Sequence, residues 1–129
     1  MTSPYQTSRI SQAALAVLVV LQLTMLGALF TLTNPHPPLA VTPFALGPFL
    51  GAALSLAVAA LILGGPINRT GAAVSIIAAV FALVSYGPHK WFDQAIGQIW
   101  PAVLLGQLAA GIVIAQAIVW LFGESRRQN

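Results

Sequence analysis

The stretch from Ile10 to Leu32, ISQAALAVLVVLQLTMLGALFTL, decides the fold class of this chain. It contains no Asp, Glu, Lys, Arg or His, and as an α-helix it would be roughly 34 Å long. The hydrocarbon layer of a bilayer is about 30 Å thick, so the stretch is long enough to cross it. Its apolar run is too long for a cleaved signal peptide, and no small-residue cleavage site follows it. The sequence therefore predicts a helix that stays in the membrane.

The composition of the whole chain points to lipid as its solvent. Hydrophobic residues make up 58% of the 129 residues and charged residues 5%, whereas an ordinary soluble domain has about 25% charged residues. A soluble domain of this length buries only about 60–70% of its chain, which is too little to hide so much apolar surface. The absence of Cys excludes disulfides, thiolate metal sites and CxxC redox chemistry. The five basic residues form no cluster or stripe, so the positive net charge does not indicate nucleic-acid binding.

Apolar stretches recur along the chain and predict four membrane spans, at about residues 10–32, 43–64, 70–86 and 100–122. An interfacial segment on the outer side is expected at about residues 88–99. Gly64-Gly65-Pro66 should end the second span, and Pro101 should begin or bend the fourth. The connections are short, so neighbouring helices should be adjacent and antiparallel. The predicted fold is an all-α membrane protein, an up-down antiparallel four-helix transmembrane bundle, with residues 1–129 forming a single transmembrane domain.

The distribution of basic residues predicts the orientation of the bundle. Arg9, Arg69, Arg126 and Arg127 lie at one end of the predicted spans, and only Lys90 lies at the other. Cytoplasmic loops carry the excess of Lys and Arg, so both termini should be cytoplasmic. The Ala-, Gly- and Leu-rich composition favours a bacterial cytoplasmic (inner) membrane.

The outer segment YGPHKWFDQAIGQIWPA, Tyr86 to Ala102, carries the most chemistry of the chain. The rings of Tyr86, Trp91 and Trp100 are expected at the outer headgroup level, where amphipathic rings prefer to lie. Asp93 is expected to cap the helical turn that leads to Trp100. The favoured interpretation is a segment that anchors the fourth span at the membrane surface.

A metal site is the weaker alternative for the same region. His36 in the preceding outer loop could meet His89 and Asp93, and two imidazoles with one carboxylate can hold zinc or iron. His89 and Asp93 would share a helix face only if a helix began before His89, which Pro88 at the first position permits. Two histidines in loops are more often solvated, so neither a metal nor a cofactor is expected.

The predicted spans contain no Asp, Glu, Lys, Arg or His. Such residues mark proton relays, ion paths and counter-charges for charged substrates. Their absence argues against proton-coupled transport, haem electron transfer between spans and transport of charged substrates. No catalytic set is present, so the chain is not expected to be an enzyme.

Uncharged polar residues remain inside the spans. Gln22 lies near the middle of the first span, and Gln107 and Gln116 lie in the fourth. A glutamine in lipid seeks a partner on another helix, so these side chains are expected to link helices. Gln107 and Gln116 are nine residues apart, which at about 100° per residue places them on opposite sides of the fourth helix. If one faces the bundle, the other should face lipid or a second protein.

Small residues recur at four-residue spacing on the predicted helices. Gly47, Gly51 and Ser55 follow one side of the second span, and Gly106 begins a similar stripe on the fourth. Such stripes let helix backbones approach closely. They are expected to mediate packing within the bundle, between copies, or against a partner.

Together these features favour a non-catalytic subunit that packs laterally in a homo-oligomer or a larger membrane complex. A transporter or channel for a neutral or lipophilic small molecule is the alternative, because the polar groups are uncharged and Pro48 should kink the second helix or mark its start. A metal-binding or enzymatic role through His36, His89 and Asp93 is the third hypothesis. The sequence identifies no substrate, partner or pathway.

Overall fold

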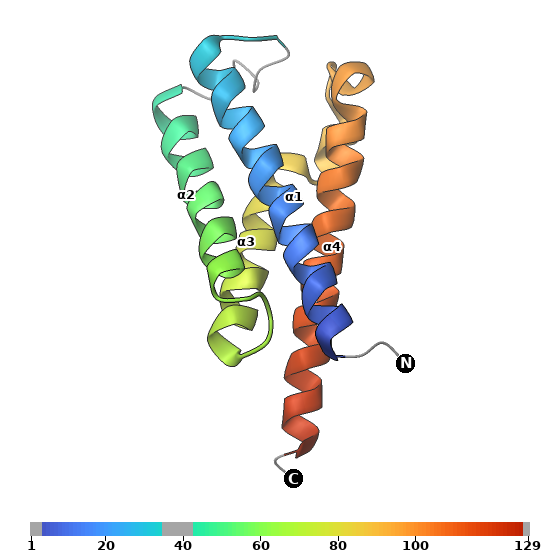
Figure 1. Cartoon of the computed structure of the whole chain (residues 1–129). Helices are drawn as coiled ribbons and strands as arrows, with labels where there is room; N and C mark the ends of the chain where they lie inside the picture. The colour runs from blue at the N-terminus through green and yellow to red at the C-terminus, as the bar shows by residue number, and fades with distance from the viewer. Residues whose placement is uncertain (1–3, 35–42, 128–129) are drawn as a thin grey trace.

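The computed structural model of the chain describes residues 4–34 and 43–127. In this part of the chain the secondary structure is entirely helical: α1 (Pro4–Thr31), α2 (Pro43–Ile62), α3 (Arg69–Tyr86), the 3₁₀ helix η1 (Pro88–Phe92) and α4 (Ile96–Arg127). Figure 1 shows that successive α-helices run in alternating directions, so that both ends of the chain lie at the same end of the molecule. The prediction of an all-helical chain with four α-helices is confirmed for the described residues.

Each α-helix contains a segment that is long and apolar enough to cross a membrane. These segments are Ser8–Thr31, Phe44–Ile62, Arg69–Phe92 and Ile96–Arg126. They overlap the four stretches expected from the sequence, but the limits differ, and the third segment continues past the end of α3 through η1. α1 begins before the predicted span, and α4 continues beyond residue 122.

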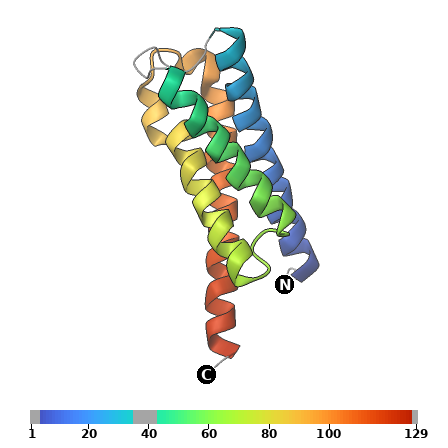
Figure 2. The ribbon, with the colours of Figure 1, turned by 90° about the vertical axis from the view of Figure 1, so that its left-hand side faces the viewer.

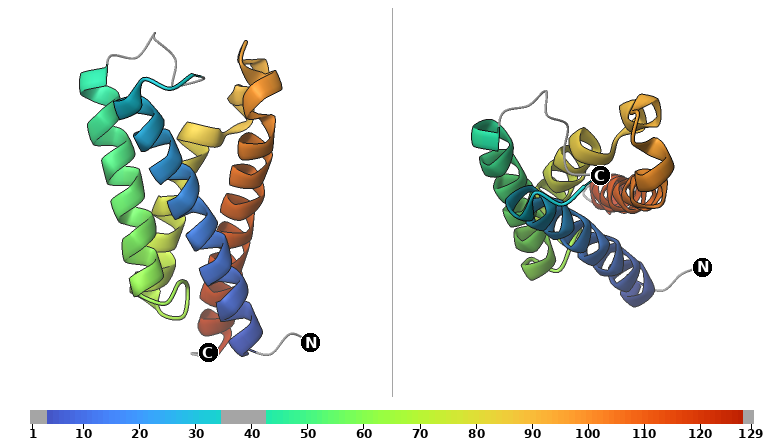
Figure 3. Two further views of the ribbon diagram at one scale, coloured as in Figure 1. Left: turned by 45° about the horizontal axis from the view of Figure 1, so that its top comes forward. Right: turned by 90° about the horizontal axis from the view of Figure 1, so that it is seen from above.

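The outer connection differs most from the expectation of a separate interfacial segment over residues 88–99. Only η1 is distinct, because α4 already begins at Ile96 and runs through Pro101. Pro101 has no N–H to donate to the carbonyl one turn earlier, and it bends a helix that continues through it. Figure 3 shows the start of α4, in light orange, turned away from the axis of the rest of the helix.

The connection between α2 and α3 is a tight glycine turn at the end of the bundle where α1 begins (Figure 1). Gly64 and Gly65 both adopt positive φ, at 81° and 76°. The Gly64 N–H donates to Leu61 O over 3.0 Å, and the Gly65 N–H donates to Ala60 O over 2.9 Å. These two bonds form a Schellman motif, which ends a helix and satisfies its last carbonyls. The predicted helix stop at these glycines is therefore confirmed.

The four α-helices are arranged as a square bundle. α1 packs against α2 and α4, and α3 packs against the same two helices, whereas α2 and α4 do not contact each other. The view from above in Figure 3 shows α1 running obliquely across the bundle. Pro48 lies inside α2, so this helix begins at Pro43 and not at Pro48.

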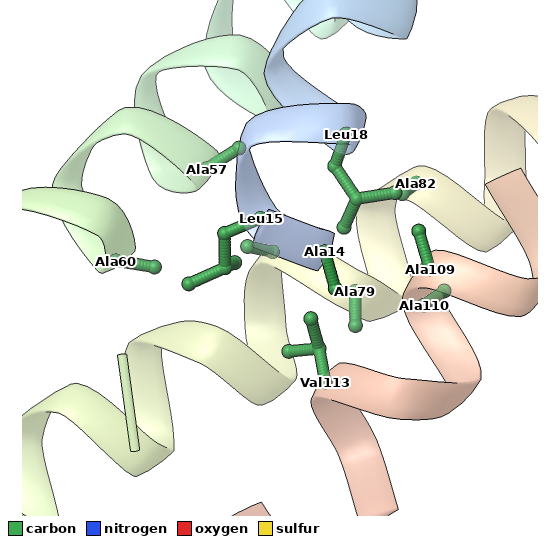
Figure 4. Close-up of a cluster of buried hydrophobic side chains, with 11 residues drawn as sticks. Ala14, Leu15, Leu18, Ala57, Ala60, Ala79, Ala82, Ala109, Ala110 and Val113 are labelled. Atoms are coloured by element: carbon green, nitrogen blue, oxygen red, sulfur yellow. The ribbon is translucent and has the colours of Figure 1, made fainter. Parts of the chain in front are cut away.

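Alanine dominates the centre of the bundle, which allows the backbones to lie close together. The side chains from all four helices that meet there are shown in Figure 4. The buried cluster consists of Ala14, Leu15, Leu18, Ala57, Ala60, Ala78, Ala79, Ala82, Ala109, Ala110 and Val113. Because membrane helices gain little from apolar burial relative to lipid, close packing of small residues is the main source of their association.

The C-terminal end of α4 extends past the other three helices. Figures 1 and 2 show its last turns continuing beyond both the start of α1 and the turn between α2 and α3. Val119 and Phe122, within the last nine residues of α4, are 65% and 68% exposed. The extension therefore carries apolar side chains that no helix of the bundle covers.

Candidate functional site

A layer of buried polar side chains joins α1 to the end of α3. Gln22 and Ser85 are both buried, and their side chains form reciprocal hydrogen bonds: Gln22 Nε2 donates to Ser85 Oγ, and Ser85 Oγ donates to Gln22 Oε1, each over 3.4 Å. Beside them, Tyr86 Oη donates to the backbone carbonyl of Leu21 over 2.7 Å. Two polar side chains of α3 are thus satisfied by one turn of α1. The expected role of Gln22, linking one helix to another, agrees with these contacts.

Gln107 extends the same layer to α4 and η1. Its Nε2 donates to the backbone carbonyl of Tyr86 over 3.1 Å, and its Oε1 accepts from Trp91 Nε1 over 3.3 Å. Tyr86 is the last residue of α3, and the last carbonyls of a helix have no partner within it. Gln107 therefore caps α3 and holds η1 against α4.

Gly106 allows α4 to approach Tyr86 closely enough for this polar layer to form. A Cβ atom at position 106 would lie 2.8 Å from Tyr86 Cβ and 3.5 Å from Leu21 Cδ1. Only glycine leaves room for the tyrosine to cross α4 and reach α1. The predicted small-residue side of α4 at Gly106 thus faces the interior of the bundle, together with the buried Ala110 and Ala117.

Gln116 is in a different position from the other two glutamines. Its side chain is half-buried, and it forms no hydrogen bond with any residue in the described ranges 4–34 and 43–127. Gln107 faces α3, and Gln116 is nine residues further along, half a turn around the helix. One of the two amides is therefore satisfied within the bundle and the other is not.

The small residues of α2 lie to one side of its buried face. The core of α2 is formed by Leu50, Ala53, Ala57 and Ala60, whereas Gly47 and Gly51 are half-buried and Ser55 is exposed. A Cβ atom at position 51 would meet no atom within 4 Å. The Ser55 hydroxyl donates to the Gly51 carbonyl over 2.8 Å, so its own helix satisfies it. This stripe leaves space beside α2 that the bundle does not use.

Asp93 already has partners other than a metal ion. Its Oδ1 accepts from the Ala95 N–H over 2.9 Å, and its Oδ2 accepts from Lys90 Nζ over 3.4 Å. The Ala95 N–H holds the pKa of Asp93 below its ordinary value, and the charges of Lys90 and His89 act in the same direction. Asp93 therefore works as a local cap, as the sequence indicated.

The geometry of η1 places His89 and Asp93, the two metal-ligand candidates that the structure describes, on different sides of this helix. Residues three apart eclipse each other on a 3₁₀ helix, so Lys90, and not His89, stands over Asp93. His89 is exposed. His36, the third candidate, lies outside the described residues. Within the described residues, no group of three or more His, Cys, Asp or Glu side chains could hold a metal ion.

Sequence reasoning did not identify Ser85 and Tyr86 as members of the polar layer. Ser85 continues the buried face of Ala78 and Ala82 at helical spacing, which is the signal that could have placed it inside. Tyr86 was expected at the outer headgroup level, but it is buried with its hydroxyl against α1. Ser75 is also fully buried, and its Oγ has no hydrogen-bond partner in the part of the chain that the structure describes.

The fold and this layer define a class of protein: a small bundle of four helices of membrane-spanning length, linked by uncharged polar side chains. Comparison with protein-family models, with curated proteins and with solved structures finds no match for this chain. Any function must therefore be argued from the bundle itself.

Proposed function

We propose that this chain is a multi-pass protein of the bacterial cytoplasmic (inner) membrane and a non-catalytic subunit that packs laterally in a homo-oligomer or a larger membrane complex. The outward side chains support the membrane part of the proposal. Only 22% of the most apolar window of α2 and 33% of those of α1 and α4 are buried inside the bundle. In water this would leave an apolar surface far larger than monomeric soluble proteins expose.

The charges support an orientation with both termini in the cytoplasm. Arg9 lies at the start of α1 and Arg69 at the start of α3, at the same end of the bundle as Arg126 near the end of α4 (Figure 1). Lys90 lies in η1 at the opposite end. An excess of basic residues marks the cytoplasmic side.

The observation that carries the proposed subunit role is the Gln116 amide, which has no hydrogen-bond partner among residues 4–34 and 43–127. Gln12, Gln22 and Gln107 form side-chain hydrogen bonds within the bundle, and Gln98 is exposed near the start of α4, whereas Gln116 is half-buried in the middle of the membrane segment of α4. An amide in hydrocarbon without a partner is unfavourable, and a contact across helices is the usual solution. The open side of α2 at Gly51 is a second place where another helix could approach closely.

The test is the mass of the particle in native membranes. A tagged chain is extracted with a membrane-solubilising polymer, and native mass spectrometry measures the particle and any protein bound to it. We expect a homo-oligomer or a complex with another membrane protein. A particle that contains one copy, with no second protein at stoichiometric amounts, contradicts the proposal.

A pathway for a neutral or lipophilic molecule is the second candidate function. The observation in its favour is Ser75, a buried hydroxyl without a hydrogen-bond partner among the described residues. Against it stands the apolar centre, where Leu15, Ala79 and Val113 are fully buried. A Ser75→Cys variant distinguishes the two, because a water-filled path would expose the new thiol to a membrane-impermeant thiol reagent and a packed centre would not.

A further inference from the structure

A row of four residues on the inner half of α4 has the spacing of a helix-pairing surface. Ile112, Gln116, Val119 and Gly123 follow each other at intervals of four, three and four residues. This alternation keeps side chains on one side of a helix and is the repeat of two-stranded helix pairs. We call these four residues the α4 seam.

The α4 seam is open in the described structure. Ile112 and Val119 are 39% and 65% exposed, and a Cβ atom at Gly123 would meet no atom within 4 Å. The lower part of the seam lies on the extension of α4, where the other three helices have ended (Figure 2). At its centre is Gln116, the half-buried amide without a hydrogen bond among the described residues.

We infer that the α4 seam binds the same seam of a second copy of this chain, in parallel and related by a two-fold axis along the bundle. This inference rests on the proposed subunit role and specifies its partner. Two copies inserted in the same orientation present their α4 helices in parallel, and a two-fold axis places each seam residue opposite itself. Gln116 suits this arrangement because an amide carries both a donor and an acceptor, so two of them satisfy each other.

The remaining positions agree with pairing between identical helices. The branched side chains of Ile112 and Val119 flank the amide above and below, and Gly123 allows the helices to approach closely. The next seam position is Arg126, where like charges would face each other and end the contact. A single polar residue in an otherwise apolar seam fixes the register of paired helices, which is the role assigned to Gln116.

Disulfide cross-linking in native membranes tests the seam directly, because the chain contains no cysteine of its own. Single-cysteine variants Ile112→Cys, Gln116→Cys and Val119→Cys are oxidised and separated without reductant. Ile118→Cys is the matched control, because Ile118 is 42% exposed and points about 160° away from Gln116 on the same helix. We expect dimers from the three seam variants and little or none from the control.

A second measurement examines the amide itself without requiring an oxidant. Energy transfer between labelled copies in liposomes gives the dimerisation constant of the native chain, Gln116→Leu and Gln116→Asn. Loss of an interhelical amide contact should weaken dimerisation about 3- to 30-fold in Gln116→Leu. Gln116→Asn keeps an amide at this position and should retain part of the affinity.

The outcomes separate this inference from the proposed function. Equal cross-linking at positions 116 and 118, or dimerisation unchanged by Gln116→Leu, would show that the α4 seam is not the contact between the two copies. This holds even if the protein assembles through another surface. Cross-linking of the seam to a different protein also overturns it, while leaving the subunit role intact. A monomer in the membrane overturns both.

Discussion

Gly106→Ala is the substitution that most directly tests the packing of the polar layer. The added methyl group would lie 2.8 Å from Tyr86 Cβ and 3.0 Å from Tyr86 Cγ. These atoms are close to the α3 backbone, so relief requires α4 to move away from α3 and not a change of side-chain rotamer. Overpacking of this kind costs about 1–3 kcal/mol, and the better helix propensity of alanine returns about 1 kcal/mol. The net loss expected is up to about 2 kcal/mol.

Gly111→Ala on the same helix provides the control. A Cβ atom there meets nothing within 4 Å, so this variant has the same gain in helix propensity without the clash. Unfolding in mixed micelles with increasing SDS, followed by tryptophan fluorescence, gives the free energy of unfolding of both variants. Gly106→Ala should be less stable than Gly111→Ala by about 1–3 kcal/mol. Equal stabilities would refute the close approach of α4 to Tyr86 on which the layer depends.

Three further predictions concern other parts of the bundle. Gln22→Leu should lower the free energy of unfolding by about 1–3 kcal/mol because it leaves the Ser85 hydroxyl buried without a partner. Adding Ser85→Ala should recover part of that loss. Additive effects of the two substitutions in this double-mutant cycle would argue against the contact between Gln22 and Ser85. Gly64→Ala should cost about 1–2 kcal/mol in the same unfolding assay, because Gly64 has φ at 81°; a neutral result would show that the turn relaxes. The Ala95 N–H lowers the pKa of Asp93, so the contribution of this carboxylate to stability is complete above its ordinary pKa and is lost as the pH falls through the lowered value. Asp93→Asn should remove that acid-dependent loss in an unfolding titration, and an unchanged acid profile would count against the cap.

The class of fold could be predicted from the sequence because lipid imposes simple rules. An uncharged apolar stretch as long as that from Ile10 to Leu32 has few alternatives to a helix. The glycine pair at Gly64 and Gly65 marked the end of α2, since only glycine readily adopts positive φ. The limits of α4 were harder to predict. Pro101 was expected to begin or bend the span, but Ile96 begins a helix that includes it.

The partners of the polar side chains could be predicted only in part. The helical period placed Gln107 and Gln116 on opposite sides of one helix, but it could not say which side would meet the bundle. That depends on Tyr86, whose carbonyl becomes available only because α3 ends there. In the same way, the spacing of Gly47, Gly51 and Ser55 revealed a stripe on α2. That Leu50 and Ala53 form the buried face of α2 could not be predicted, because it depends on where the other helices lie.

The alanine-rich centre limits how this protein can change its shape. An alanine side chain has no rotamers, so a cluster built mainly from alanine cannot adjust by exchanging one rotamer for another. Any rearrangement of the centre therefore requires whole helices to slide or tilt as rigid rods. A signal arriving at one end of such a bundle would reach the other end as a displacement of a helix axis.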